Sequence, residues 1–297
     1  SHGYNFLSYN TRIIPTYGLK ISKLRKIVVT SALPYANGDI HMGHVLEHVQ
    51  TDIWVRQMRQ SGHEVLSFCA DDAHGAPVMM RSEELGIDPQ DFIGPVKDSH
   101  ISSLKKFGIT YNNYHSTHSS ENEELATEVY LAAKKAGYIY KEEIEQCFDE
   151  EKQMFLADRY ITGECPKCSA QNQYGDGCDS CGVTYSATEL VNPKSTLTGS
   201  TPSHKISEHV FFNLEKSKGM LKQFLDTANM QKPIVSKLSE WLDGELKSWD
   251  ISRDAPYFGF SIPEENNKFF YVWVDAPIGY LASAKNWAET NSTNIQN

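Results

Sequence analysis

The chain has 297 residues, 40% of which are hydrophobic, and its formal net charge at pH 7 is −10. This length predicts one large or two smaller domains with a sizeable buried core, while the negative charge argues against general binding of nucleic-acid phosphates, which require a basic surface. No apolar run approaches the roughly 18 residues that a membrane span needs, so we expect a soluble protein with no membrane partner.

Residues 1–25 are predicted to be a leader or the remnant of a cleaved tag. The segment contains basic residues and no acidic residue, a composition that mitochondrial transit segments share. Ser1-His2 at the start is instead typical of a cleaved tag. We therefore favour a tag remnant followed by a basic leader.

A β-type run at residues 27–32 is followed by a tight turn and then by a helical pattern that ends at Ser61-Gly62. Ligands bind at such junctions because backbone N–H groups and the positive end of the helix dipole point into the crevice. His41 and His44 would share one face at the start of this helix, where both imidazoles can donate to phosphate oxygens. Gly43 lets a base or a phosphate approach the backbone. A helix start with two histidines present by chance is the alternative.

The same segment resembles a known nucleotide-binding sequence. His41-Met42-Gly43-His44 resembles the signature of class I aminoacyl-tRNA synthetases, in which the second position varies, and residues 32–38 are similar to methionyl-tRNA synthetases. The resemblance implies that His41 and His44 act in catalysis. It implies further that ATP contacts Tyr35, His41, Gly43 and His44, and that methionine contacts Ala32, Leu33 and Tyr35.

Residues 64–70 predict a second buried strand that runs directly into Asp71-Asp72. Carboxylates at the carboxyl end of a parallel strand lie in the ligand crevice. One of the two could simply cap the next helix, but two adjacent acids cost energy unless a cation binds there. The ammonium group of an amino acid is such a cation. The resemblance to methionyl-tRNA synthetases implies that Asp72 holds it.

The pattern of the following residues predicts three helices and a further strand, up to about residue 140, where the composition changes. The helices are expected at residues 77–86, 89–107 and 121–137, with a strand or extended turn at 109–116. For His115 and His118 we expect a structural role. Together, residues 26–140 are predicted to form the first half of the catalytic domain and residues 141–230 a connective insertion.

Four of the six cysteines form two Cys-x-x-Cys pairs. Such pairs supply four thiolates to one tetrahedral zinc ion, which predicts a structural Zn2+ bound by Cys165, Cys168, Cys178 and Cys181. Zinc ribbons also bind nucleic acid, but residues 169–177 between the pairs contain no Lys or Arg. Cys69 and Cys147 are expected to be buried thiols, which fits a reducing compartment and a cytoplasmic protein.

The last third is predicted to return to the catalytic domain over residues 231–297. We expect a connecting loop at 189–210, a strand at 210–214, a helix at 232–249 and a buried parallel strand at 269–274. Arg253 could steer phosphates or pair with a neighbouring aspartate to fix a turn. The resemblance favours a catalytic role near the phosphates. It also implies that methionine contacts Trp273, Ala276, Pro277 and Tyr280.

The predicted fold class is α/β, a Rossmann-like class I synthetase nucleotide-binding fold with an inserted zinc knuckle. The resemblance implies methionine–tRNA ligase activity, with ATP, L-methionine and tRNA(Met) as partners and Mg2+ accompanying ATP. No Lys-Met-Ser-Lys-Ser loop is present, so we expect a fragment that lacks this loop and the anticodon-binding domain and has little activity alone. A nucleotidyltransferase that adenylylates a small cofactor and a zinc-ribbon binding module are the alternatives.

Overall fold

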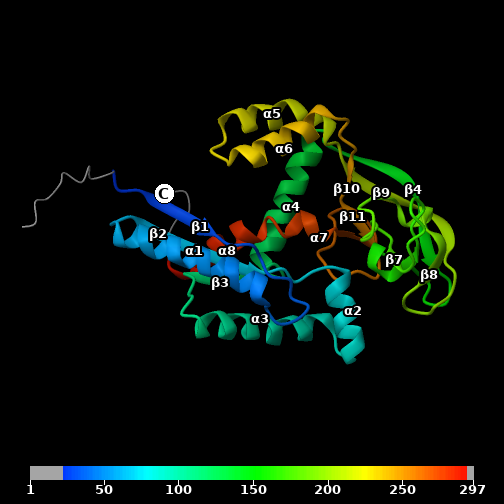
Figure 1. The fold of residues 1–297 in the computed structure, drawn as a ribbon, viewed down its shortest axis with the longest axis horizontal. Coiled ribbons are helices and arrows are strands. Elements are labelled where there is room, and N and C mark those ends of the chain that lie inside the picture. The colour runs from blue at the N-terminus through cyan, green and yellow to red at the C-terminus, as the bar shows by residue number, and fades with distance from the viewer. Residues whose placement is uncertain (1–22, 293–297) are drawn as a thin grey trace, which may run out of the picture.

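The computed structural model describes residues 23–292 and contains a parallel sheet surrounded by helices (Figure 1). This sheet has the order β1-β2-β3, formed by β1 (Lys26–Thr30), β2 (Glu64–Asp71) and β3 (Asn113–Ser116). Helix α1 (Met42–Gln60) connects the first two strands, and α2 (Ala76–Leu85) and α3 (Pro89–Lys106) connect β2 with β3. The βαβ order predicted from the first 70 residues is therefore confirmed.

Strand β2 is central, and its second half is buried on both faces, as expected for a parallel strand. Three later helices pack near it: α4 (Ser120–Lys135), α7 (Val272–Asp275) and α8 (Gly279–Thr290). The hydroxyl of Ser283 in α8 donates to the carbonyl oxygen of Cys69 in β2 at 2.9 Å, although 214 residues separate them. The end of the chain thus returns to the first sheet.

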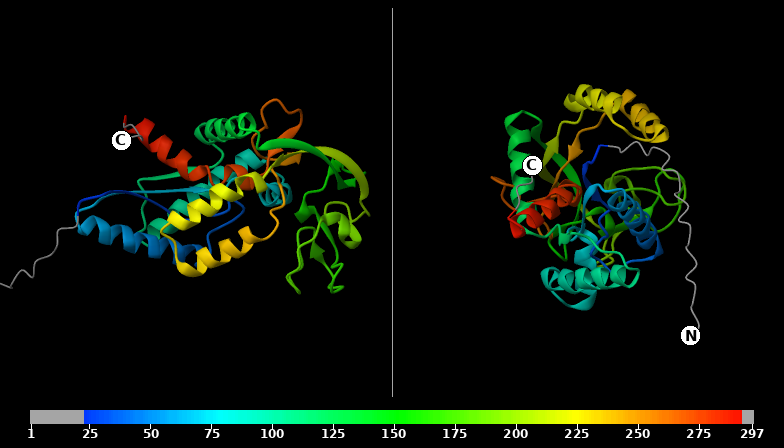
Figure 2. Two further views of the ribbon diagram at one scale, coloured as in Figure 1. Left: turned by 90° about the horizontal axis from the view of Figure 1, so that it is seen from above. Right: turned by 90° about the vertical axis from the view of Figure 1, so that its left-hand side faces the viewer.

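The middle of the chain forms a second, antiparallel unit that projects at the end of the molecule opposite the last turn of α8 (Figure 2). Its long pair is β4 (Ile139–Asp149) with β9 (Ser203–Phe212), extended in the order β10-β9-β4-β5 by β5 (Met154–Phe155) and β10 (Trp249–Asp250). A smaller sheet of order β7-β6-β8 contains β6 (Ile161–Glu164), β7 (Gln173–Tyr174) and β8 (Val191–Ser195).

The remaining elements are short. A helical hairpin of α5 (Lys218–Thr227) and α6 (Lys232–Asp243) is held by a leucine cluster around Leu225, Leu242 and Leu246. The pair β11 (Ser252–Asp254) and β12 (Lys268–Phe270) is antiparallel. Single 3-10 turns are η1 (Asp158–Tyr160), η2 (Ala187–Glu189) and η3 (Glu215–Ser217). None of the helices within residues 23–292 has the length and apolar character of a membrane span.

Two predictions about this half of the chain are wrong. The expected loop at 189–210 contains β8 and most of β9; β8 is an edge strand, where Pro193 removes no required donor. The expected parallel strand at 269–274 is the end of β12 followed by α7, because a short apolar run does not distinguish a buried strand from a buried helical turn. The helix predicted at 232–249 stops at Asp243, before Gly244.

Candidate active site

The first turn of α1 is capped by the two histidines predicted there. Nδ1 of His41 accepts a hydrogen bond from the Gly43 N–H at 3.1 Å, and Nδ1 of His44 accepts one from the His41 N–H at 3.3 Å. The two rings stack with 3.7 Å between their centroids. Because each Nδ1 is an acceptor, the proton of each neutral ring lies on Nε2. Both Nε2–H groups remain available as donors for a ligand.

Two further details suit this turn to anion binding. Burial and the neighbouring His41 lower the pKa of His44, so the His44 ring is neutral at pH 7 and donates through Nε2. A Cβ atom at Gly43 would lie 2.9 Å from Cε1 of His41. A side chain at this position would therefore push the first histidine out of its capping position.

The segment before α1 crosses the end of β2. The Asp72 N–H donates to the Pro34 carbonyl at 2.8 Å, and the Ala36 N–H donates to the Asp72 carbonyl at 2.7 Å. Tyr35 extends over the following loop, because a Cβ atom at Gly75 would lie 2.9 Å from the Tyr35 hydroxyl. Gly75 has a φ of +99°, which few residues other than glycine adopt. The structure thus brings Tyr35 and Asp72 together.

The carboxylates at this strand end have buried oxygen atoms that lack hydrogen-bond partners in the described part of the chain, and both oxygens of Asp71 are among them. Oδ1 of Asp72 has no hydrogen-bond partner within the described residues, and the same is true of Oδ1 of Asp275 in α7. Burial raises the pKa of Asp72 well above its usual range, and the negative charges of Asp275 and Asp71 raise it further. A buried carboxylate without a partner is unstable when ionised. The site therefore favours a cationic ligand.

The α7–α8 segment packs against the turn that contains Leu33. A Cβ atom at Gly279 would lie 3.0 Å from Cδ1 of Leu33, so the start of α8 packs directly on the Leu33 turn. The Tyr280 hydroxyl interacts with the Leu33 backbone. The structure therefore gathers four of the predicted methionine contacts, namely Leu33, Tyr35, Asp72 and Tyr280.

The other predicted methionine contacts lie at the outside of this crevice. Trp273 is 62% exposed. Ala32 and Pro277 are also exposed, and Ala276 is half-buried. In the structure, no contact within the described residues fixes Trp273 as a wall of the crevice, and its role stays a prediction.

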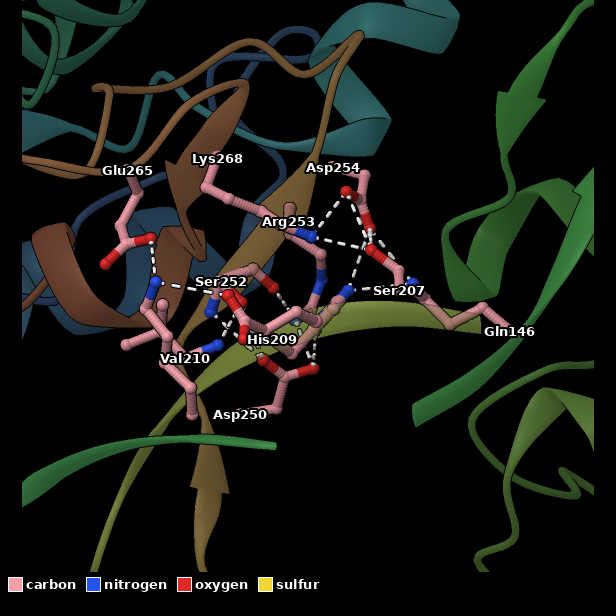
Figure 3. Close-up of polar contacts among 12 residues, drawn as sticks. Gln146, Ser207, His209, Val210, Asp250, Ser252, Arg253, Asp254, Glu265 and Lys268 are labelled. Atoms are coloured by element: carbon pink, nitrogen blue, oxygen red, sulfur yellow. Dashed lines mark hydrogen bonds and ion pairs between the residues drawn. The ribbon is translucent and has the colours of Figure 1, made fainter. Parts of the chain in front are cut away.

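Arg253 projects from β11 beside a buried polar network that joins the antiparallel unit to the rest of the chain (Figure 3). Its guanidinium lies 3.9 Å from the centroid of the Tyr271 ring and 3.4 Å from Oδ2 of Asp250. Both sequence-based interpretations are thus still open, since this arrangement ties Arg253 to an aspartate and also leaves it facing a cavity of about 300 Å3. The hydrogen bonds of His41 and His44 lie elsewhere, at the first turn of α1.

His209 in β9 is the centre of that network. Its ring is 1% exposed and lies 2.8 Å from Oδ2 of Asp250 and 2.8 Å from Oδ2 of Asp254 (Figure 3). The Ser207 hydroxyl and Lys268 also donate to Asp254. Burial disfavours the charged forms of His209 and Asp254. The hydrogen bonds of this network outweigh this effect, so they raise the pKa of His209 and hold the pKa of Asp254 below its usual range.

We expect Asp254→Asn to destabilise the protein by about 3 kcal/mol, because it leaves buried cationic partners without their carboxylate. The exposed pair of Lys237 and Glu240 provides the control, and Glu240→Gln should cost about 0.5 kcal/mol or less. Urea unfolding at pH 5.5 measures both.

The contribution of Asp254 to the free energy of unfolding should depend on pH. It is present above the ordinary carboxyl pKa of about 3.9 and is lost as pH falls through the lowered pKa of the folded protein. The His209 contribution is present below about pH 6.5 and is lost as pH rises through the raised value. Equal midpoints for the two variants would contradict this account.

The four predicted cysteine ligands converge at one point. All four sulfur atoms lie within 4.8 Å of one another, and Sγ–Sγ distances are 3.8 Å for Cys165 with Cys181 and 3.6 Å for Cys168 with Cys178. Thiolates at about 2.3 Å from a tetrahedral zinc are about 3.8 Å apart. Backbone N–H groups of Lys167 and Cys168 point at Sγ of Cys165. The donor set and its spacing therefore fit zinc, with no open coordination position.

Sequence reasoning missed two buried residues of the crevice, His74 and Asp275. Nδ1 of His74 lies 2.5 Å from Oδ2 of Asp275, and both side chains are 0% exposed. His74 follows Asp72 by two residues, so its place at the end of β2 was a signal that could have identified it. Asp275 gave no such signal, because its position depends on the helical turn α7.

Comparisons with known proteins identify the family and the fold. The family described as tRNA synthetases class I (M) matches residues 27–296. Two solved structures of Mycobacterium tuberculosis methionyl-tRNA synthetase, one bound by methionyl-adenylate and one in complex with it, resemble the fold with a TM-score of 0.66 and 20% sequence identity. In each case the match covers 88% of this chain and 47% of the other, so the chain spans about half their length. Because the family model matches almost the whole sequence, this chain belongs to the family of class I tRNA synthetases (M).

Proposed function

We propose that the crevice between the Leu33–Tyr35 turn, the end of β2 and the α7–α8 segment binds L-methionine and that the protein activates it with ATP. The observation that carries the proposal is the half-buried Asp72 carboxylate, whose buried Oδ1 has no partner within the described residues. The ammonium group of an amino acid supplies the missing positive charge. Leu33, Tyr35 and Tyr280 surround the carboxylate, and Ala32, Trp273, Ala276 and Pro277 complete the proposed methionine pocket from its rim.

In the proposed reaction, the methionine carboxylate attacks the α-phosphate of ATP, giving methionyl adenylate and pyrophosphate. His41 and His44 donate their Nε2–H groups to the phosphate oxygens, where negative charge develops in the transition state. Tyr35 and Gly43 contact ATP in the same crevice. Arg253 is proposed as a further cation near the phosphates. Positioning accounts for most of the rate enhancement, because side chains form no covalent intermediate in this scheme.

The other partners follow from the same proposal. Transfer of the methionyl group to the terminal ribose of tRNA(Met) is the second step, and Mg2+ bound to ATP would supply charge neutralisation at the phosphates. Cys165, Cys168, Cys178 and Cys181 would hold one structural zinc. We assign residues 26–140 and 231–297 to the catalytic unit and 141–230 to the insertion. The long β4–β9 pair supports this division. A cytoplasmic location stays a prediction.

Calorimetric titration tests the proposal with L-methionine and with the sulfamoyl analogue of methionyl adenylate. Both should bind, and His44→Asn should weaken the analogue about 10-fold or more while leaving methionine binding unchanged, because it removes one donor to the phosphate position. Asparagine keeps an acceptor near the place of Nδ1, so the cap on α1 is retained. His44→Gln is the matched variant, because its amide reaches the place of Nε2.

A smaller loss of analogue affinity in His44→Gln than in His44→Asn is expected. If both ligands fail to bind the unchanged chain, the methionine assignment is wrong. Binding of ATP without methionine would instead favour a nucleotidyltransferase of another small molecule.

A further inference from the structure

A chain of hydrogen bonds leads from the carboxylate pair of the crevice toward the surface. Oδ2 of Asp275 is bonded to Nδ1 of His74 at 2.5 Å, and Nε2 of His74 is bonded to Nδ1 of His118 at 2.9 Å. Asp275 and His74 are 0% exposed, whereas His118 is half-buried. The His118 ring stacks on Phe258 with 5.0 Å between centroids. These contacts fix the orientation of the His74 and His118 rings.

The inner end of this hydrogen-bonded chain lies near Asp72, because Asp275 is bonded to His74, two residues after Asp72, and its negative charge raises the pKa of Asp72. Helix α7 packs on the loop that follows Asp72, because a Cβ atom at Gly75 would lie 3.4 Å from Cβ of Val272. Oδ1 of Asp72 and Oδ1 of Asp275 both lack a hydrogen-bond partner within residues 23–292. Two nearby buried carboxyls ionise together only at a large energetic cost, so one of the two retains a proton.

Burial raises the pKa of Asp275, and among the groups that face the pair it is His74 that opposes this rise, through its hydrogen bond and its charge. Tyr35, Tyr257 and Tyr271 are neutral, because burial raises the pKa of each hydroxyl. Asp71 adds a third carboxyl, whose pKa burial raises to about 6. His74 is the remaining titratable group in contact with the pair, through Asp275.

We propose that Asp72 and Asp275 form an acid pair that holds one proton in the empty crevice, and that the ammonium group of the bound amino acid displaces this proton through His74 to His118. The inference rests on the proposed function, because it takes methionine as the ligand whose ammonium group enters. It assigns Asp275 as a second carboxylate for that group. His74 and His118 are positioning residues that also carry the proton.

The proton transfers balance at every atom. In the empty state, the Asp275 carboxyl donates from Oδ2 to Nδ1 of His74, and Nε2–H of His74 donates to Nδ1 of His118. When the ammonium group binds, the Oδ2–H bond breaks and an Nδ1–H bond forms on His74. The Nε2 proton of His74 moves to Nδ1 of His118, and the Nε2 proton of His118 goes to water. Both histidines thereby change from the Nε2–H to the Nδ1–H tautomer.

Calorimetry in two buffers of different ionisation enthalpy counts the released protons. For the unchanged chain at pH 7, binding of L-methionine should release about one proton. Asp275→Asn should reduce the release to near zero, and it preserves the size of the side chain and, through its amide N–H, a donor to Nδ1 of His74. Asp98→Asn, at an exposed position of α3, is the control, and it should release as many protons as the unchanged chain.

The outcomes separate this inference from the proposed function. Methionine binding without proton release overturns the acid pair but leaves the methionine site intact, whereas no binding at all refutes the site itself. NMR of the protein labelled with 15N in its histidine rings tests the proposed proton path through His74 and His118. The His74 and His118 rings should change tautomer on addition of methionine, and unchanged tautomers would remove them from the path. A purely structural role for these histidines predicts no change.

Discussion

Asp72→Asn should weaken the binding of L-methionine about 30-fold or more, because truncating one partner of a buried charge pair costs about 2–5 kcal/mol. The same substitution should stabilise the empty protein by about 1 kcal/mol or more, since it removes a buried carboxylate that has an unpartnered oxygen and lies near other acids. Loss of binding together with a gain in stability distinguishes a ligand-binding carboxylate from a structural one.

The gain in stability should depend on pH. The pKa of Asp72 in the folded protein is raised, so its favourable contribution is complete below the ordinary carboxyl pKa of about 3.9 and is lost as pH rises through the raised value. The two proteins should therefore have similar urea midpoints at low pH and diverge as pH increases. Asp98→Asn, at an exposed position of α3, is the control and should change neither affinity nor stability. Unchanged methionine affinity in Asp72→Asn would refute the assigned role.

Removal of one zinc ligand should unfold the small sheet of the insertion while the parallel sheet stays folded. Structural zinc stabilises small metal-bound units by about 10–16 kcal/mol, and the β7-β6-β8 sheet has only short strands of its own. We expect one zinc per chain in the unchanged protein and almost none in Cys178→Ala. Trypsin should then cleave at Lys167, between two of the ligands.

The control for this experiment is another buried cysteine of the antiparallel unit. Cys147 is 1% exposed and packs in the cluster with Ile161 and Leu190. Cys147→Ala should keep the zinc and the resistance to trypsin, even if the protein loses some stability. Full zinc content in Cys178→Ala would contradict the four-cysteine centre.

Local patterns predicted the parts of the site that depend on neighbouring residues. The strand, turn and helix around His41 and the two acids after β2 follow from hydrophobic periodicity and from the rule that ligands bind at strand ends. The metal centre was predictable because four thiolates at this spacing have few other uses. The helices at α2, α3 and α4 are confirmed for the same reason, since each has a clear period.

Long-range contacts could not be predicted in this way. The hydrogen bond between His74 and Asp275 joins residues 201 positions apart. It depends on helix α7, whose residues were predicted to be part of a strand. The end of strand β9 falls in the strand predicted at 210–214, but its first part was missed, because the mostly polar residues 203–209 form a strand by pairing with β4, and this pairing is a tertiary contact. The prediction for Trp273 rests on its place in the apolar run 269–274 and on the family resemblance; its side chain is 62% exposed, and its role in the pocket stays a prediction.

The central claim is that Leu33, Tyr35, Asp72 and Tyr280 surround the substrate amino acid. A crystal structure of this chain with the sulfamoyl analogue of methionyl adenylate tests it most directly. We predict that the ammonium nitrogen lies within hydrogen-bond distance of the Asp72 carboxylate, and that the sulfamoyl oxygens face Nε2 of His41 and His44. An analogue bound elsewhere, for example in the cavity beside Arg253, with the crevice at Asp72 filled only by water, would contradict the account.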